Sequence, residues 1–213
     1  MTVSAGQATS FLGPHGHDYS RLADCLRQFG DEEIIYIPNR GNAGDALIAL
    51  GTFLFFDAIG LRYKVGERSE SYPGRVVVFA GGGALIDVYP NSDAILRRNH
   101  TVCKALVVLP HSVRAYPELL GEMDERCTIF SREHPTNTYL RAHGTRAVID
   151  HCHDLAFFAS EADIVAEPWD TVLLWEPTRR FAWLKMFVKF LAVSRYRTST
   201  LNIFRQDSEK TDV

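Results

Sequence analysis

The sequence has few cysteines and no excess of positive charge, and both shortages limit what the protein can do. Its four cysteines lie far apart and form no C-x-x-C pair, which is typical of reduced, small apolar residues in a cytoplasmic protein. The 23 basic residues are outnumbered by 26 acidic residues. Because nucleic-acid-binding proteins carry a basic patch, this balance gives no support for a nucleic-acid partner.

Long apolar runs and targeting signals are also missing. No uninterrupted apolar stretch reaches the roughly 18 residues that suggest a membrane span, and the N-terminus does not resemble a signal peptide. We also find no internal repeat and no low-complexity tract. We therefore expect a cytoplasmic α/β protein.

The apolar residues that are present form a regular alternation. Short apolar runs of strand length alternate with segments of helical periodicity, which predicts a doubly wound, parallel, Rossmann-like sheet. The expected strands are 34–37, 62–65, 76–80, 105–109, 127–130 and 147–149, and the expected helices are 19–29, 46–59, 92–100, 116–126 and 135–143.

Three regions of the chain differ in composition. Residues 1–18 are rich in Gly, Ser, Thr and Ala without periodicity, so we expect a mobile tail. Residues 19–160 carry the alternation and form the predicted Rossmann-like domain. We expect residues 161–213 to provide a linker helix and the start of an incomplete second domain, after an acidic, loop-like segment at 161–169.

The linker helix is expected over residues 178–193. It has a wide apolar face and a narrow stripe formed by Lys185 and Lys189. Such a helix packs between two lobes, or it lies as a cationic helix on a membrane surface. The second reading would place the protein at the inner face of the membrane.

Glycine and polar residues follow five of the predicted strands directly. These groups are 39–45, 81–83, 111–112, 132–133 and 150–154. The carboxyl ends of parallel strands lie on one edge of a sheet, where α/β proteins bind ligands. The sequence therefore predicts a single site at that edge.

The turn between the first strand and the first buried helix is the centre of this pattern. Gly41 and Gly44 permit close approach of the backbone, and a helix N-terminus favours an anion. The turn matches neither a dinucleotide fingerprint nor a P-loop. Asp45 either caps the helix or orients a sugar hydroxyl, and Asn42 either adopts a left-handed turn or contacts the substrate.

The other groups have equally open readings. Gly81, Gly82 and Gly83 form a turn or let a substrate approach the backbone. Arg132 and Glu133 form a surface ion pair, or Arg132 clamps an anion.

The segment from His151 to Asp154 contains potential metal ligands. On an extended chain His151 and His153 face one way while Cys152 and Asp154 face the other, so we predict no metal site.

Five segments together resemble the polysaccharide pyruvyl transferase family, in order and in approximate spacing. They are Gly41-Asn-Ala-Gly-Asp-Ala-Leu-Ile48, Gly81-Gly-Gly-Ala-Leu85, Leu109-Pro-His-Ser112, Phe130-Ser-Arg-Glu133 and His153-Asp-Leu-Ala-Phe-Phe158. The first of them is the most specific.

The resemblance implies a fold, a reaction and a set of site residues. It implies the first lobe of a GT-B-like two-lobe enzyme that transfers a pyruvyl group from phosphoenolpyruvate to a sugar of a bacterial exopolysaccharide or its lipid-linked precursor. No cofactor is expected, since phosphoenolpyruvate is the donor substrate. We predict catalytic roles for Asn42, Asp45 and Arg132, and substrate-binding roles for Gly41, Gly44, Gly81, Gly82, Gly83, His111, Ser112 and Glu133.

One family motif is not carried over. The letters Arg141-Ala-His-Gly144 match a donor-associated motif of the second lobe, but they end a first-lobe helix. We therefore expect the donor-binding lobe to be missing from this chain, which would work with a partner chain or as a homodimer. Two alternatives stay open, namely a noncatalytic sugar- or anion-binding lobe that needs a partner and a nucleotide-binding α/β enzyme domain.

Overall fold

The computed structural model describes residues 10–39, 41, 43–89, 92–143 and 145–166. The described residues up to 165 form one compact unit. The predicted helix over 178–193 and the predicted second domain lie outside the described residues. Within the described ranges, every helix is too short or too polar to cross a membrane.

The centre of the unit is a sheet of seven strands in which every pairing is parallel. The strands are β1 (Ile34–Ile37), β2 (Tyr63–Val65), β3 (Val76–Phe79), β4 (Gly82–Leu85), β5 (Ala105–Val113), β6 (Cys127–Ser131) and β7 (Val148–His151). Their order is β2-β1-β3-β5-β6-β7, and β4 pairs with the end of β5. The predicted α/β fold with a Rossmann-like parallel sheet is confirmed.

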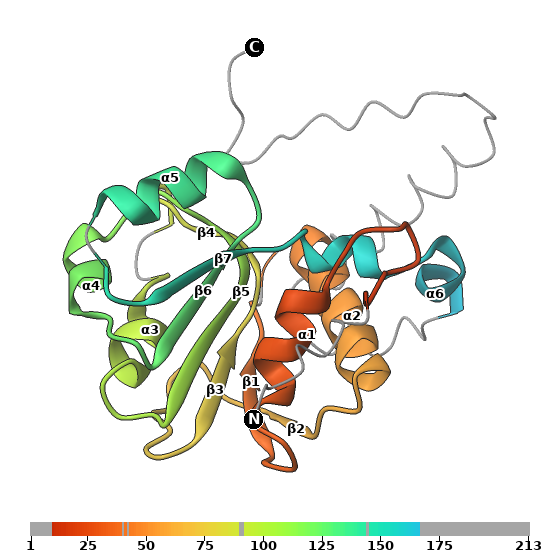
Figure 1. The fold of residues 1–213 in the computed structure, drawn as a ribbon, viewed down its shortest axis with the longest axis horizontal. Coiled ribbons are helices and arrows are strands. Elements are labelled where there is room, and N and C mark those ends of the chain that lie inside the picture. Colours follow the sequence, from red (N-terminus) through yellow and green to blue (C-terminus); the bar gives the residue numbers. More distant parts are fainter. Residues whose placement is uncertain (1–9, 40, 42, 90–91, 144, 167–213) are drawn as a thin grey trace, which may run out of the picture. The chain divides into compact units, whose positions relative to one another are not determined.

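Helices cover both faces of this sheet (Figure 1). They are α1 (Ser20–Arg27), α2 (Ala43–Ala58), α3 (Ala94–Asn99), α4 (Pro117–Glu122), α5 (His134–Ala142) and α6 (Glu161–Ala166), with a 3₁₀ turn η1 (Leu155–Phe158). Two apolar cores result. Helices α1 and α2 pack on one face of the strands, and α3, α4 and α5 pack on the other.

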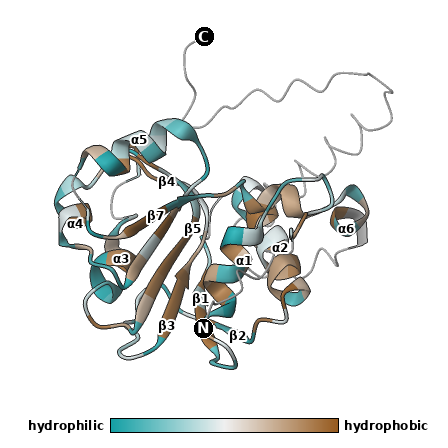
Figure 2. Cartoon of the chain, in the orientation of Figure 1, coloured by the Kyte–Doolittle hydropathy of each residue, from teal (hydrophilic) through white to brown (hydrophobic). Residues whose placement is uncertain are grey.

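The strands alternate between these two cores because successive side chains point to opposite faces. Ile34 and Tyr36 belong to the core under α2, whereas Ile35 and Ile37 belong to the core under α3. Figure 2 shows the central strands as an apolar layer, and helix α2, which packs on one face of it, is also largely apolar. Continuous burial explains why these strands appear in the sequence as unbroken apolar runs.

The strand order reverses between β1 and β3. From β1 the chain passes through α2 to β2 on one side, and it then returns to β3 on the other side of β1. This reversal leaves a topological switch point at the carboxyl ends of β1 and β3, where open α/β sheets bind ligands. The loops after these two strands therefore define the expected location of a site.

The structure differs from the expected elements at the carboxyl end of β5. The strand runs to Val113, so His111 and Ser112 lie within it rather than after it. Gly82 and Gly83 belong to strand β4 rather than to a turn. Strand β4 continues the line of β3 along β5 after a break at Ala80 and Gly81.

Two further differences concern the ends of the described unit. Residues 161–166 form α6 instead of a loop, because Ser160 and Asp163 cap its N-terminus reciprocally. Near the other end, Phe11 stacks on Phe158 with ring centroids 6.0 Å apart, and a bridge joins Leu12 to Asp18. Residues of the expected tail therefore pack on the sheet unit.

Candidate functional site

Asp45 lies at the switch point, in the first turn of α2. It is the third residue of the helix, so it does not occupy the N-cap position. A Cβ added to Gly41 would lie 2.0 Å from Asp45 Oδ2, and one added to Gly82 would lie 3.6 Å from Asp45 Oδ1. The carboxylate is therefore held between two glycines that come from the ends of different strands.

Asn39 joins the two loops of the switch point. Asn39 is 6% exposed and lies two residues after the end of β1, and its Nδ2 donates to the Gly81 carbonyl at 3.0 Å. Its Oδ1 accepts a hydrogen bond from Arg68 Nη1, also at 3.0 Å. This network connects the loop after β2 to the ends of β1 and β3.

The glycines between β3 and β4 meet a geometric requirement. A Cβ on Gly81 would lie 2.6 Å from the Pro110 carbonyl oxygen, which belongs to the backbone of β5. Gly82 has φ +134°, a conformation that residues with a side chain rarely adopt. Both glycines are needed for the backbone path, and they also leave Asp45 and Asn39 uncovered by side chains from this loop.

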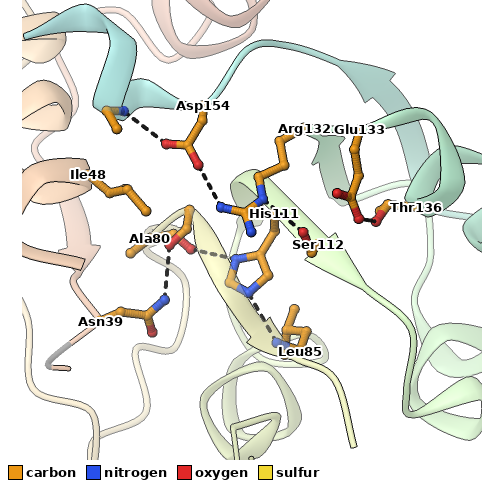
Figure 3. A network of polar contacts seen from close by, with 12 residues as sticks. Asn39, Ile48, Ala80, Leu85, His111, Ser112, Arg132, Glu133, Thr136 and Asp154 are labelled. Atoms are coloured by element: carbon orange, nitrogen blue, oxygen red, sulfur yellow. Dashed lines mark hydrogen bonds and ion pairs between the residues drawn. The ribbon is translucent and has the colours of Figure 1, made fainter. Parts of the chain in front are cut away.

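His111 is buried in the sheet and bonds only to the backbone (Figure 3). Its Nδ1 is 3.0 Å from the Ala80 carbonyl oxygen, and its Nε2 accepts the Leu85 N–H at 3.2 Å. The pKa of His111 is lowered to about 3, mainly by burial and further by the charge of Arg132. The hydrogen bond to Ala80 raises the pKa but does not offset these two effects. A neutral imidazole thus fills the break between β3 and β4, and the predicted substrate-binding role of His111 stays a prediction.

Arg132 is fixed by two partners near the end of β6. Its Nε donates to Ser112 Oγ at 2.8 Å, and its Nη1 donates to Asp154 Oδ2 at 2.7 Å (Figure 3). Asp154 also accepts the Ala156 N–H and so caps η1. The guanidinium therefore ties β5 and β6 to η1, and the predicted role as an anion clamp stays a prediction.

Glu133 points away from this group towards β5 and α5. Its Oε1 accepts hydrogen bonds from Arg114 Nη2 and Thr136 Oγ1, each at 3.0 Å. Burial raises the pKa of Glu133, but hydrogen bonds from Thr136, Arg114 and Ser112 outweigh that effect and hold the pKa below its ordinary value. Glu133 is therefore an ionised group that also positions the first turn of α5.

The histidines after β7 do not assemble a metal site. The rings of His17 and His153 lie tilted against each other with their centroids 4.2 Å apart, and the ring centroid of His151 is 6.1 Å from that of His153. In the described part of the chain, no three His, Cys, Asp or Glu side chains converge closely enough to hold a metal ion.

The predicted site residues thus fall into two groups. Gly41, Asp45, Gly81 and Gly82 meet at the switch point, whereas Ser112 and Arg132 meet at the ends of β5 and β6. Gly44 is exposed in the first turn of α2, Gly83 is half-buried in β4, and Asn42 lies outside the described residues.

Sequence reasoning missed two members of the site. Arg68 lies in a polar loop after the weakest strand signal, and no local pattern marks it. Asp154 was recognised as a polar residue after a strand, but its pairing with Arg132 spans 22 residues and has no local signature. Asn39 begins the polar group 39–45 at the predicted site edge, but its contact with Arg68 has no local signature.

Comparisons with known proteins agree with the fold and with part of the sequence reading. No protein-family model matches the chain. The chain is 30% identical over 128 residues to the protein named "Putative pyruvyl transferase EpsO" of Bacillus subtilis (strain 168). That match covers 53% of this chain and 37% of the relative, so the chain corresponds to well under half of the relative's length.

A solved structure also matches the fold. It is the crystal structure of an uncharacterized protein, KP1_0663, from Klebsiella pneumoniae subsp. pneumoniae NTUH-K2044, with a TM-score of 0.62 and 24% sequence identity. The match covers 70% of this chain and 59% of that protein, and it supports the fold alone. The predicted resemblance is thus confirmed: over about half of its length, this Rossmann-like chain resembles a protein that is named a putative pyruvyl transferase.

Proposed function

We propose that this chain forms the acceptor-binding lobe of a polysaccharide pyruvyl transferase with two Rossmann-like lobes of the GT-B type. One observation carries the proposal. In a chain similar to a protein named as a pyruvyl transferase, the Asp45 carboxylate lies between Gly41 and Gly82 at the switch point of the sheet.

The proposed reaction forms a pyruvate ketal on a sugar. Two hydroxyl oxygens of the acceptor form bonds to C2 of phosphoenolpyruvate, the bond from C2 to the phosphate oxygen breaks, and C3 gains a proton to become a methyl group. Of the two hydroxyl protons, one accounts for the proton added to C3, and the other leaves with inorganic phosphate. The reaction therefore needs a base near an oriented sugar hydroxyl.

Asp45 is suited to that task by its position. An ionised carboxylate accepts hydrogen bonds from two hydroxyls, and the glycines beside it let it lie against the backbone of two loops. Asn42, which precedes α2, is proposed to orient a second hydroxyl. Arg132 and Ser112 are proposed to act near the acceptor from the ends of β6 and β5.

The donor makes different demands. Phosphoenolpyruvate carries a carboxylate and a phosphate, which need cationic partners held in line with the acceptor, and such positioning contributes up to about 7–11 kcal/mol. In the described residues Arg132, beside the proposed acceptor position, is already bonded to Ser112 and Asp154. We propose that the main donor-binding groups lie on the second lobe.

The acceptor would be a sugar of an exopolysaccharide or its lipid-linked precursor. A lipid-linked acceptor would bring the protein to the inner face of the membrane. No nucleic-acid partner enters this proposal.

The test combines the chain with phosphoenolpyruvate labelled with ¹³C at C3 and a lipid-linked oligosaccharide extract. The reaction is run with and without a polypeptide that carries the unmatched part of the Bacillus relative. We expect a ketal methyl signal only in the combination. Asp45→Asn should reduce its rate at least about a hundredfold, the lower limit for losing a general base.

The matched control is Asp57→Asn, because Asp57 is an exposed acid at the other end of the same helix. It should keep the wild-type rate. Absence of the ketal from the combination, or an unchanged rate in Asp45→Asn, would refute the proposal. Turnover by the chain alone would instead place the donor-binding groups within this chain.

A further inference from the structure

Arg68 lies at the switch point although it comes from a loop without any recognised motif. It follows β2 by three residues and is half-buried. Its Nη1 donates to Asn39 Oδ1 at 3.0 Å, and the other end of the Asn39 amide donates to the Gly81 carbonyl. Arg68 is thus one hydrogen-bonded residue away from the glycines that border Asp45.

The loop that carries Arg68 is held at several points. Arg98 Nη1 donates to the Arg68 carbonyl at 3.2 Å, and the Glu67 N–H donates to the Tyr72 hydroxyl at 2.6 Å. The Tyr72 N–H donates to Asn99 Oδ1, and Asn99 is fully buried in α3. Anchors on both sides of Arg68 fix the origin of its side chain, as expected for a residue that must be placed accurately.

The Asn39 amide, which accepts the hydrogen bond of Arg68, and the Asp45 carboxylate lie beside one glycine. A Cβ on Gly82 would lie 3.3 Å from Asn39 Nδ2 and 3.6 Å from Asp45 Oδ1, so the carboxylate and the Asn39 amide lie on the same side of this residue. A carboxylate accepts sugar hydroxyls, whereas a guanidinium pairs with phosphate oxygens through parallel N–H groups. A ligand that carries both hydroxyls and a phosphate ester would satisfy both groups.

We propose that Arg68 binds the phosphate of a glycosyl phosphate whose sugar is held by Asp45. This inference rests on the proposed acceptor function and adds a substrate class to it. The phosphate belongs either to a free sugar phosphate or to the headgroup of a polyprenyl-linked sugar. Arg68 then discriminates phosphorylated acceptors from neutral sugars.

The test is a binding measurement on the full chain, without any transfer assay. The ligands are glucose, glucose 1-phosphate, and glucosyl phosphate linked to a polyprenyl chain in phosphatidylcholine vesicles. We expect wild-type protein to bind at least one of the phosphorylated ligands more tightly than glucose. Arg68→Gln should weaken that binding tenfold or more and leave glucose binding unchanged, while Arg68→Lys should retain part of the preference.

Arg62→Gln is the matched control, because Arg62 is an exposed arginine just before β2 that donates to the Asp31 carbonyl. It should change affinity less than twofold. An equal loss of glucose and glucose 1-phosphate binding in Arg68→Gln would show that Arg68 only supports Asn39, and would overturn the proposal. Wild-type protein that does not prefer a phosphorylated ligand would also overturn it.

These outcomes are separate from those of the proposed function. Pyruvyl transfer by the combined polypeptides with no effect of Arg68→Gln on binding would remove only the role of Arg68. Phosphate-dependent binding without pyruvyl transfer would support the role of Arg68 and leave the reaction class refuted.

Discussion

The side chain of His111 makes hydrogen bonds to backbone groups at the break in the sheet. Its ring receives the Leu85 N–H and bonds to the Ala80 carbonyl, groups on either side of the break between β3 and β4. Pro110, directly before it, has no N–H to give to a neighbouring strand. The imidazole thus meets hydrogen-bonding needs that the backbone of β5 leaves open.

The buried neutral state of His111 predicts a pH-dependent stability. The unfolded chain binds a proton at this residue below its ordinary pKa of 6.5, whereas the folded chain does so only near pH 3, so stability falls as the pH drops between these values. From pH 7 to pH 5 the loss should be about 2 kcal/mol. Urea unfolding at both pH values measures it.

His111→Gln is the comparison for this measurement, since it keeps an amide donor and acceptor but does not titrate. The variant should be less stable than the wild type at pH 7. Between pH 7 and pH 5, however, its free energy of unfolding should fall by about 2 kcal/mol less than that of the wild type. Equal pH dependence in the two proteins would contradict the buried neutral histidine.

Among the elements, α2 is positioned by its contact with η1. A Cβ on Gly51 would lie 1.8 Å from the Leu155 carbonyl oxygen, so the backbones of the two elements touch there. Asp154 caps η1 and pairs with Arg132, the residue directly after β6. The position of α2, and with it Asp45, therefore depends on a chain of contacts that begins at β6.

Gly51→Ala should destabilise the protein by about 1–3 kcal/mol, because the Leu155 backbone must move to admit the methyl group. The gain in helix propensity, about 1 kcal/mol, would offset only part of this cost. Thermal and urea unfolding measure the net effect.

Gly121→Ala in α4 is the matched control. A Cβ there would meet no atom within 4 Å, so only the propensity term remains and stability should rise slightly. A Gly51→Ala variant as stable as Gly121→Ala would show that the α2–η1 contact is not tight.

The elements also show what could be predicted from sequence. Strands β1 and β3 are predictable because complete burial leaves an unbroken apolar run, and the end of α5 is predictable because Gly144 follows it in the sequence. Strand β4 was missed, since glycines have low strand propensity and its pairing depends on the extension of β5. The site edge was predictable from glycine and polar residues after strands, but the partners of Arg132 and Asn39 were not, because those contacts are nonlocal.

Across the whole unit, the protection of backbone amides against hydrogen exchange should follow the position of each strand in the sheet. The central strands β1 and β3 are fully buried, whereas β2 and β7 lie at the two ends of the sheet with exposed residues such as Val65 and Val148. Edge strands open locally at a lower free energy than central ones. Amides of β2 and β7 should therefore exchange faster than those of β1, β3 and β5.

Hydrogen exchange followed by mass spectrometry measures this order under native conditions. Peptides covering 105–109 serve as the internal reference for the slowest exchange. Protection of β7 equal to that of β5 would contradict the prediction and would indicate that another part of the protein covers that edge.

The hydrogen bond between Asn39 and Gly81 also bears on when the site forms during folding. It joins residues 42 positions apart, and it can form only after β3 has paired with β1. Closing that loop costs entropy before any contact is gained, so a nascent chain with only β1, α2 and β2 in place would have the Gly41 turn but no complete site. A ligand of this site would therefore bind only after the centre of the sheet has closed, and its binding would selectively stabilise the fully assembled sheet.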